Sequence, residues 1–562
     1  MKSLLFLLAA CAAAAQNPAA APDAAAGRLL DRLFDRIVQR ENAMIARAGG
    51  RSPLVETYIQ ETAASGASEN LSDRPNKDEY FLGRFHITAD RMIAYEPLLA
   101  RTGAPPAKAS SGLVSKIPFF HEEPKDRPLQ FFPRGFAQMA FPDLQDFNRA
   151  TYKFDYVRRE FLGEVRCLVF DVAPIRGADP GRFLGRIWVE DQGDSIVRFD
   201  GTYVPSPARK GEAPQLYFHF DSWRVNVAPG EWAPAVIYVE EQAPAGAAAA
   251  IPRFKAQTRI WDYAGQATDK IGELTQILVD SESGVEDRAH APDTSPLESQ
   301  RAWERQAEDN VVARLEKAGF LAPPGPVDDV LNTVLNNLIV SAKLNVEAHC
   351  RVLLTTPLET FSVGHTIVIS RGLIDVLPDE ASLALVIADE LSHIVLGQPT
   401  PTQFAFSTLT MLSDADLLQK FQFARSPEEM DAAGKKTIEI MRASPYQKKT
   451  ANVGLFLKAL ASRRLDLPRL LSANLGNQVA NADSLSRLSA FASSAPALEA
   501  AKIEQIAALP LGSRIKLNPW NNQIVLMKTR PLSLLSPREK MPFEVTPFML
   551  HLTRVEKAAP HR

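Results

Sequence analysis

The stretch DEASLALVIADELSHIVLG, residues 379–397, decides how the C-terminal half of this chain folds. Asp379 is a good N-cap residue, and Gly397 closes a helix at the other end. Residues 381–396 are apolar at almost every position, which predicts a helix that is buried along its length. Such a helix has to give each ionisable side chain a hydrogen-bond partner, an opposite charge or a metal. The ionisable side chains in its second half are Asp389, Glu390 and His393.

These three residues have the spacing of the H-E-x-x-H motif, with aspartate in place of the first histidine. In the intact motif two histidines four residues apart bind zinc, and the glutamate between them activates the metal-bound water. One imidazole and the catalytic carboxylate therefore remain in this chain. Aspartate can also ligate zinc, so the motif alone leaves two interpretations open, a working site and a degenerate one.

The segments around the motif resemble the zinc metallopeptidases of the HtpX, BepA and CAAX-prenyl-protease type. Members of that family read N-A-F-A, then an extended run, a G-L-L turn and A-H-E-x-x-H. This chain reads Glu359-Thr360-Phe361-Ser362, then Gly372-Leu373-Ile374, then Ala388-Asp389-Glu390-Leu391-Ser392-His393. The resemblance covers residues 325–535. It implies a mostly helical metallopeptidase-like domain with a short edge sheet, a zinc cofactor and Glu390 as the catalytic base.

The rest of the family pattern is altered in this chain. The third zinc ligand of the family is a glutamate five residues before a glycine. When that glycine is aligned with Gly454, the ligand position falls on Lys449. An ammonium group repels a divalent cation, so we expect an ion pair between Asp389 and Lys449 to replace the metal. If the alignment is shifted, an acid such as Glu439 or Asp431 completes a real site. The other cleft candidates are Arg514 and His365, the latter being on the extended segment where a substrate strand would pair.

From about residue 80 to residue 264 the apolar residues alternate with polar ones. Two strand-like runs flank Asp191-Gln192-Gly193-Asp194, which predicts a hairpin. Further strands of the same kind predict one antiparallel, strongly twisted sheet. The run Phe183-Leu184-Gly185-Arg186-Ile187-Trp188-Val189, with Arg198-Phe199-Asp200-Gly201 on the next strand, resembles the LolA, LolB and RseB half-barrel. That resemblance implies a concave apolar face suited to lipid or lipoprotein; a plain β-domain that docks onto its neighbour is the alternative.

The predicted fold class is α+β, with an N-terminal antiparallel half-barrel followed by the helical domain. The expected boundaries divide the 562 residues into six segments. These are a signal peptide (1–15), a tether and amphipathic helix (16–70), the LolA-like β-domain (71–280), a linker and helix (281–324), the metallopeptidase-like domain (325–535) and a C-terminal tail (536–562).

The N-terminus predicts export, because Lys2 precedes a short apolar run and an alanine tract. Cleavage after Ala15 is the favoured processing, and lipid modification of Cys11 is the alternative. A periplasmic or extracellular location follows. Cys167 and Cys350, in different domains, are expected to be buried free thiols.

A formal net charge of −3 argues against nucleic acid as a partner, and no later stretch is apolar enough to span a bilayer. The preferred function is a degenerate peptidase that binds peptides or envelope proteins, a quality-control factor without strong catalysis. An active zinc metalloendopeptidase and a lipid- or lipoprotein-binding protein are the alternatives.

Overall fold

The computed structural model describes residues 24–62, 75–99, 131–175, 180–204, 218–241, 254–264, 296–402, 405, 413–479, 488–499, 505, 509–512, 514–527 and 543–555. The signal peptide, Cys11 and the linker residues 281–295 lie outside these ranges. Within them, no helix combines the length and the hydropathy that crossing a membrane requires. Cys167 and Cys350 are both free and buried, as predicted.

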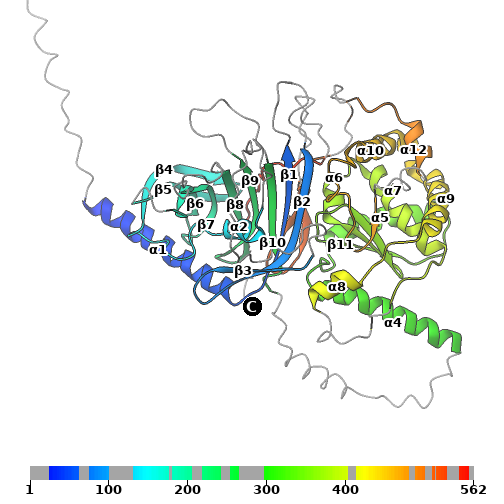
Figure 1. The fold of residues 1–562 in the computed structure, drawn as a ribbon, viewed down its shortest axis with the longest axis horizontal. Coiled ribbons are helices and arrows are strands. Elements are labelled where there is room, and N and C mark those ends of the chain that lie inside the picture. The colour runs from blue at the N-terminus through cyan, green and yellow to red at the C-terminus, as the bar shows by residue number, and fades with distance from the viewer. Residues whose placement is uncertain are drawn as a thin grey trace, which may run out of the picture.

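The N-terminal half is one open antiparallel sheet of ten strands (Figure 1). Its order is β3-β2-β1-β10-β9-β8-β7-β6-β5-β4, with β3 and β4 at the two edges. Strands that pair with each other are consecutive in the sequence, except that β1 pairs with β10. The predicted hairpin is confirmed as the turn between β6 and β7. The strands are β1 (Leu54–Thr62), β2 (Pro75–Ile87), β3 (Ile93–Pro97), β4 (Tyr152–Leu162), β5 (Val165–Pro174), β6 (Phe183–Glu190), β7 (Ile196–Tyr203), β8 (Phe218–Ala228), β9 (Glu231–Glu241) and β10 (Phe254–Trp261).

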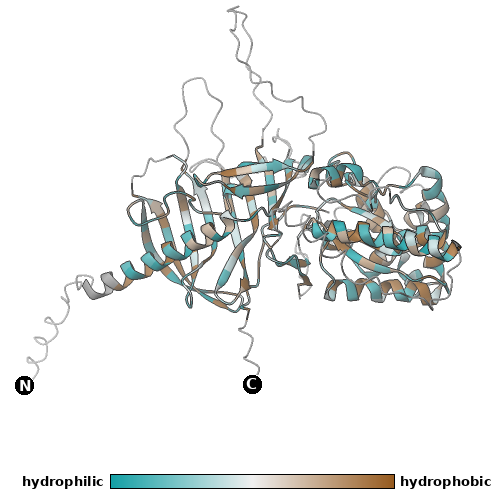
Figure 2. Cartoon of the chain, turned by 90° about the horizontal axis from the view of Figure 1, so that it is seen from below, coloured by the Kyte–Doolittle hydropathy of each residue, from teal (hydrophilic) through white to brown (hydrophobic). Residues whose placement is uncertain are grey.

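Two helices cover one side of this sheet, which we call the inner face. They are α1 (Ala24–Gly49) and α2 (Pro133–Gln138), and α1 runs across the strands (Figure 2). The apolar stripe of α1 buries Phe34, Ile37 and Ile45 in one cluster with the sheet. The predicted amphipathic helix is therefore a packing element. Strand β1 lies within the 16–70 segment that we expected to hold only a tether and this helix.

The C-terminal half surrounds a four-stranded sheet of order β11-β13-β12-β14. The α+β class is thus confirmed, and the buried helix predicted at residues 381–396 is present as α7. The elements are α4 (Pro296–Lys317), α5 (Pro326–Ser341), β11 (His349–Leu353), β12 (Glu359–Val363), β13 (Thr366–Ser370), α6 (Arg371–Val376), α7 (Glu380–Val395), α8 (Asp414–Lys420), α9 (Pro427–Ala443), the 3-10 segment η2 (Pro445–Lys449), α10 (Thr450–Arg463), β14 (Asn477–Gln478), α12 (Ser489–Ser494), β15 (Ile515–Leu517) and β16 (Ile524–Leu526).

The two halves meet on the other side of the ten-stranded sheet, the outer face. Here Glu56 of β1 and Arg371 of α6 form an ion pair at 2.7 Å, and both side chains are buried. Glu56 also accepts hydrogen bonds from the backbone and hydroxyl of Thr356 and from the Tyr80 hydroxyl. Gly372 follows Arg371 because a Cβ at that position would collide with the carbonyl oxygen of Thr356. The Arg-Gly-Leu turn therefore docks one half onto the other.

More polar contacts join the halves along β2. Asp78 accepts hydrogen bonds from the backbone N–H groups of Arg469 and Leu470, at 2.9 and 2.8 Å. Arg84 donates to Asp414 at 2.7 Å. Burial raises the pKa of Asp78 to about 6, against the opposing effect of the two backbone donors. These buried polar groups have their hydrogen-bond partners in this arrangement of the two halves, which favours this one relative orientation.

The segment 543–555, which we call the strap, lies across the outer face. It begins at β1, where Gln60 binds the backbone of Phe543 and Val545. Its other end lies on the same face near β5 and β6, where Glu164 N–H donates to Leu552 O at 2.9 Å and Arg554 pairs with Glu190 at 2.6 Å. The predicted C-terminal tail is therefore part of the β-domain in its described portion.

Candidate functional site

We call Asp389, Glu390, His393 and their hydrogen-bond partners the α7 centre. Helix α7 begins as predicted, with the Asp379 side chain accepting from Ser382 N–H at 2.9 Å. Asp389 and His393 are four residues apart and so lie on one side of the helix. Glu390 and His393 are fully buried, whereas Asp389 is half-buried.

Glu390 ties the helix to the neighbouring sheet. Its Oε1 accepts from Thr360 Oγ1 of β12 at 2.8 Å and from Asn477 Nδ2 of β14 at 3.1 Å. Its Oε2 is buried and has no partner among the described residues. The carboxylate therefore joins three elements through one oxygen. Neither Thr360 nor Asn477 carried a functional prediction, because a lone threonine or asparagine forms no recognisable motif.

His393 is held through its Nδ1, which lies 2.5 Å from Gln398 Oε1. The amide of Gln398 is oriented by a second bond, in which its Nε2 donates to Glu429 O at 3.1 Å. Nδ1 then donates to Gln398, and in this tautomer the lone pair of the ring is on Nε2. Nε2 is buried and, in the described part of the chain, has no partner. Nε2 and the Oε2 atom of Glu390 are the buried atoms of the centre that could each ligate a metal.

The predicted ion pair between Asp389 and Lys449 is not formed, although both residues are described. Lys449 is exposed at the end of η2, directly before α10 begins. The Asp389 carboxylate instead lies 3.1 Å from Thr437 Oγ1 of α9. Gly454, on which the alignment was made, packs so closely that a Cβ there would collide with Ala495 of the segment after α12.

The donor set does not fit zinc. A zinc site needs at least three protein ligands. Glu439 and Asp431, the alternative ligands, are exposed on α9. Nowhere in the described ranges do three histidine, cysteine, aspartate or glutamate side chains come together in a metal-binding group. We therefore derive no chemical step through a metal.

The two further cleft candidates lie elsewhere in the fold. His365 is exposed in the turn between β12 and β13, with Nδ1 2.8 Å from Glu347 O. Arg514 lies before β15, where its backbone N–H donates to Asp375 and its side chain to Pro378 O at 3.4 Å. Burial lowers the pKa of Arg514. Neither side chain makes a contact at the α7 centre.

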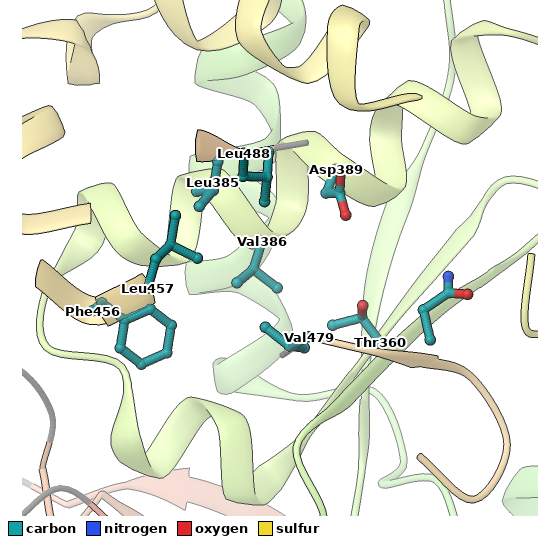
Figure 3. A pocket seen from close by; sticks show the side chains of 9 residues that line it. Thr360, Leu385, Val386, Asp389, Phe456, Leu457, Val479 and Leu488 are labelled. Atoms are coloured by element: carbon teal, nitrogen blue, oxygen red, sulfur yellow. The ribbon is translucent and has the colours of Figure 1, made fainter. Parts of the chain in front are cut away.

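The space beside the α7 centre is almost filled. A cavity of about 20 Å³, room for about one water molecule, lies between Asp389 and the apolar side chains of α7 and α10 (Figure 3). Strand β12, expected at an edge, is paired on both sides where it passes the centre. Its Thr360 lies opposite Ile369 of β13 and Asn477 of β14. The chain itself thus occupies the position where a substrate strand would pair.

The inner face differs in character, because aromatic side chains line it. Phe34 of α1 stacks on Phe154 of β4 with ring centroids 4.8 Å apart and meets Phe170 edge-on at 5.2 Å. A hollow of about 370 Å³ opens between α1 and the ends of β4 and β5. The buried phenylalanines of this face are Phe34, Phe81, Phe85, Phe131, Phe136, Phe141, Phe147, Phe170, Phe183, Phe199, Phe220 and Phe254.

No family model matches this chain, and no curated protein does. Among solved structures it is similar to a LolA superfamily protein from Nitrosomonas europaea, with 12% identity over 41% of this chain and 91% of that one and a TM-score of 0.22. It is also similar to a putative outer membrane lipoprotein-sorting protein domain from Vibrio parahaemolyticus, with 11% identity over 44% of this chain and 99% of that one and a TM-score of 0.20. TM-scores this low carry no functional argument. Neither structure is described as a metallopeptidase, and that resemblance stays a prediction.

Proposed function

We propose that this chain binds the hydrocarbon part of a lipid or lipoprotein on the inner face of its ten-stranded sheet. The observation that carries the proposal is the phenylalanine lining of that face together with the hollow beneath α1. Small-molecule sites are usually pockets of several hundred Å³ with mostly apolar walls and a few polar groups, and here Asp31, Arg149 and Lys153 are the charged residues of the lining. Each buried methylene group contributes about 0.8 kcal/mol, so an acyl chain is the ligand that best uses such a surface.

The entrance to the hollow is marked by exposed apolar side chains. Ile175, at the end of β5, lines the hollow and is 58% exposed, and Tyr156 on β4 is 51% exposed. Leu29 and Leu30 of α1 are also exposed. Of these side chains Ile175 lines the hollow together with Phe34, so it is the exposed apolar residue that an incoming chain would contact there.

Helix α1 is the cover that a larger ligand has to displace. One buried ion pair holds it: Glu41 accepts from both terminal nitrogens of Arg224, at 2.6 and 2.7 Å. Its other pairs are at the surface, such as Arg36 with Asp194 at 2.6 Å. Surface pairs contribute little, about 0–1 kcal/mol each. The first half of α1, before Glu41, is held mainly by the burial of Phe34 and Ile37, and an acyl chain that replaces those contacts would offset the cost of moving it.

The test is binding of a fluorescent fatty-acid probe to the purified protein, with mass spectrometry of any lipid that co-purifies. Ile175→Glu places a charge in the hollow and is expected to weaken probe binding about tenfold. Phe161→Glu is the control, because Phe161 is 66% exposed on β4 and does not line the hollow. Equal loss in both variants, or no binding by the wild type, would refute the proposal.

For the α7 centre we propose a structural role in place of peptidase or peptide-binding activity. Glu390 is occupied by Thr360 and Asn477, and the cavity beside it holds about one water molecule. A catalytic base needs its carboxylate within reach of a substrate-bound water. An enclosed carboxylate that bridges a helix and two strands is suited to holding those elements together.

A further inference from the structure

A second cavity, of about 190 Å³, lies between α1 and the ends of strands β7, β8 and β9. It is separate from the hollow under Phe34 and shares no lining residue with it. Its walls include Met44 of α1, Ile196 of β7 and the indole of Trp232 on β9. What distinguishes it is the hydrogen-bonding state of the groups that line it.

Two buried donors in this cavity have no acceptor within the described structure. Arg224 is 1% exposed; its terminal nitrogens bind Glu41, but its Nε has no partner. Trp232 is 5% exposed, and its Nε1 is also without a partner. Leaving a buried donor unsatisfied costs about 1–3 kcal/mol, so two in one cavity indicate that an acceptor belongs there.

The charges around the cavity favour an anionic acceptor. Glu41 is neutralised by Arg224, and Glu231 pairs with Arg47 at the mouth. Arg40, on the same side of α1, also lines the cavity and has no carboxylate partner in the described residues, so the lining carries one excess positive charge. A cation would meet two carboxylates that are already paired with arginines, and it would add to the excess positive charge. An oxyanion can accept from the two buried N–H groups while Arg40 and Arg47 approach from outside.

We propose that this cavity is a binding site for a phosphate oxyanion, either free or as the headgroup of a phospholipid. Phosphate has enough acceptor oxygens for both buried donors and for the arginines at the mouth. The site itself stands independently of the proposed lipid binding, whereas the phospholipid source rests on it. In that case the headgroup lies between α1 and β9 and the acyl chains lie along the inner face.

The experiment is calorimetric titration of the full mature protein with inorganic phosphate, followed by flotation with vesicles of phosphatidylglycerol or of phosphatidylcholine. Trp232→Phe removes one donor and keeps an aromatic ring, and we expect about tenfold weaker phosphate binding. Arg40→Gln is expected to weaken binding several-fold. Arg36→Gln is the matched control on the same helix, since Arg36 does not line the cavity. Thermal unfolding verifies that each variant is folded.

The outcomes separate the two sources and the two sites. Phosphate binding that Trp232→Phe weakens and Ile175→Glu preserves supports the site whether or not the acyl hollow exists. Binding of phosphatidylglycerol vesicles that both variants weaken identifies a phospholipid headgroup. If neither phosphate nor either vesicle binds the wild type, the cavity holds water only and the proposal is overturned. Equal affinities for Trp232→Phe, Arg36→Gln and the wild type would overturn it as well.

Discussion

The two faces of the ten-stranded sheet are built from the same strands but hold their partners by different means. The inner face meets α1 and α2 through phenylalanine packing and one buried ion pair, Arg224 with Glu41. The outer face meets the C-terminal half through an apolar cluster of its own and, in addition, through buried polar groups such as Glu56 and Asp78. Apolar packing is non-directional and can be exchanged for a ligand of similar chemistry. A satisfied polar network cannot be exchanged in this way, so the inner face, where one buried ion pair accompanies the apolar packing, is better suited to binding and release than the outer face.

Breaking the outer face is expected to give the largest effect. Arg371→Met leaves the Glu56 carboxylate buried without its cation, and we expect a loss of about 3–5 kcal/mol in the free energy of unfolding in urea. The double variant Glu56→Gln/Arg371→Met should recover part of this loss, because no unpaired charge remains. If Arg371→Met were as stable as the wild type, the buried ion pair would not stabilise the outer face, and the proposed difference between the two faces would be contradicted.

Breaking the inner-face ion pair should have a smaller, local effect. Glu41→Ala leaves Arg224 with only its bond to Ile196 O, and we expect about 2–3 kcal/mol of destabilisation confined to α1. Hydrogen exchange should speed up in α1 amides and stay unchanged in α7. Arg36→Gln, at an exposed pair, should cost less than 1 kcal/mol. Exchange that speeds up equally in both halves would contradict this difference between the faces.

The pH dependence sharpens the same comparison. The pKa of Asp78 is raised to about 6 from its ordinary 3.8, so the folded state holds this proton more tightly than the unfolded state. The stability it contributes is present below pH 4 and is lost as the pH rises through 6. The loss amounts to up to about 3 kcal/mol. Asp78→Asn should flatten the urea-unfolding profile between pH 4 and 6, whereas the exposed Asp155→Asn should not.

The smallest effect is expected at the α7 centre. Glu390→Gln keeps an acceptor for Thr360 and Asn477 and removes a buried charge, but it also leaves a buried amide N–H group without an acceptor. These effects oppose each other, so stability should change by less than about 1 kcal/mol. Elemental mass spectrometry should find far less than one zinc per chain in the wild type. Stoichiometric zinc that disappears in His393→Ala would instead revive the peptidase hypothesis.

Local patterns predicted the elements well, and contacts between distant residues could not be predicted. The stripe on α1, the hairpin at residues 191–194 and the capped α7 all follow from side-chain periodicity and end signals. The pairing of Glu56 with Arg371 joins residues far apart in the sequence, and no pattern at either position identifies the other. Strand β14 has only two residues, too few to show any alternation. Lys449 ends a short 3-10 segment directly before α10, and no sequence pattern predicted that segment.

The strap has a consequence for the way this protein is made. Residues 543–555 are synthesised almost 300 residues after β10, yet they cover an outer face whose strands are complete by residue 261. Until then, Trp223, Val225 and other side chains of that face are without their final partners. A chain that passes through a secretion channel meets the same delay. Holding such a chain unfolded until its last segment has crossed would protect it from aggregation, and a truncation before residue 543 should yield insoluble protein even though every strand of the ten-stranded sheet is present.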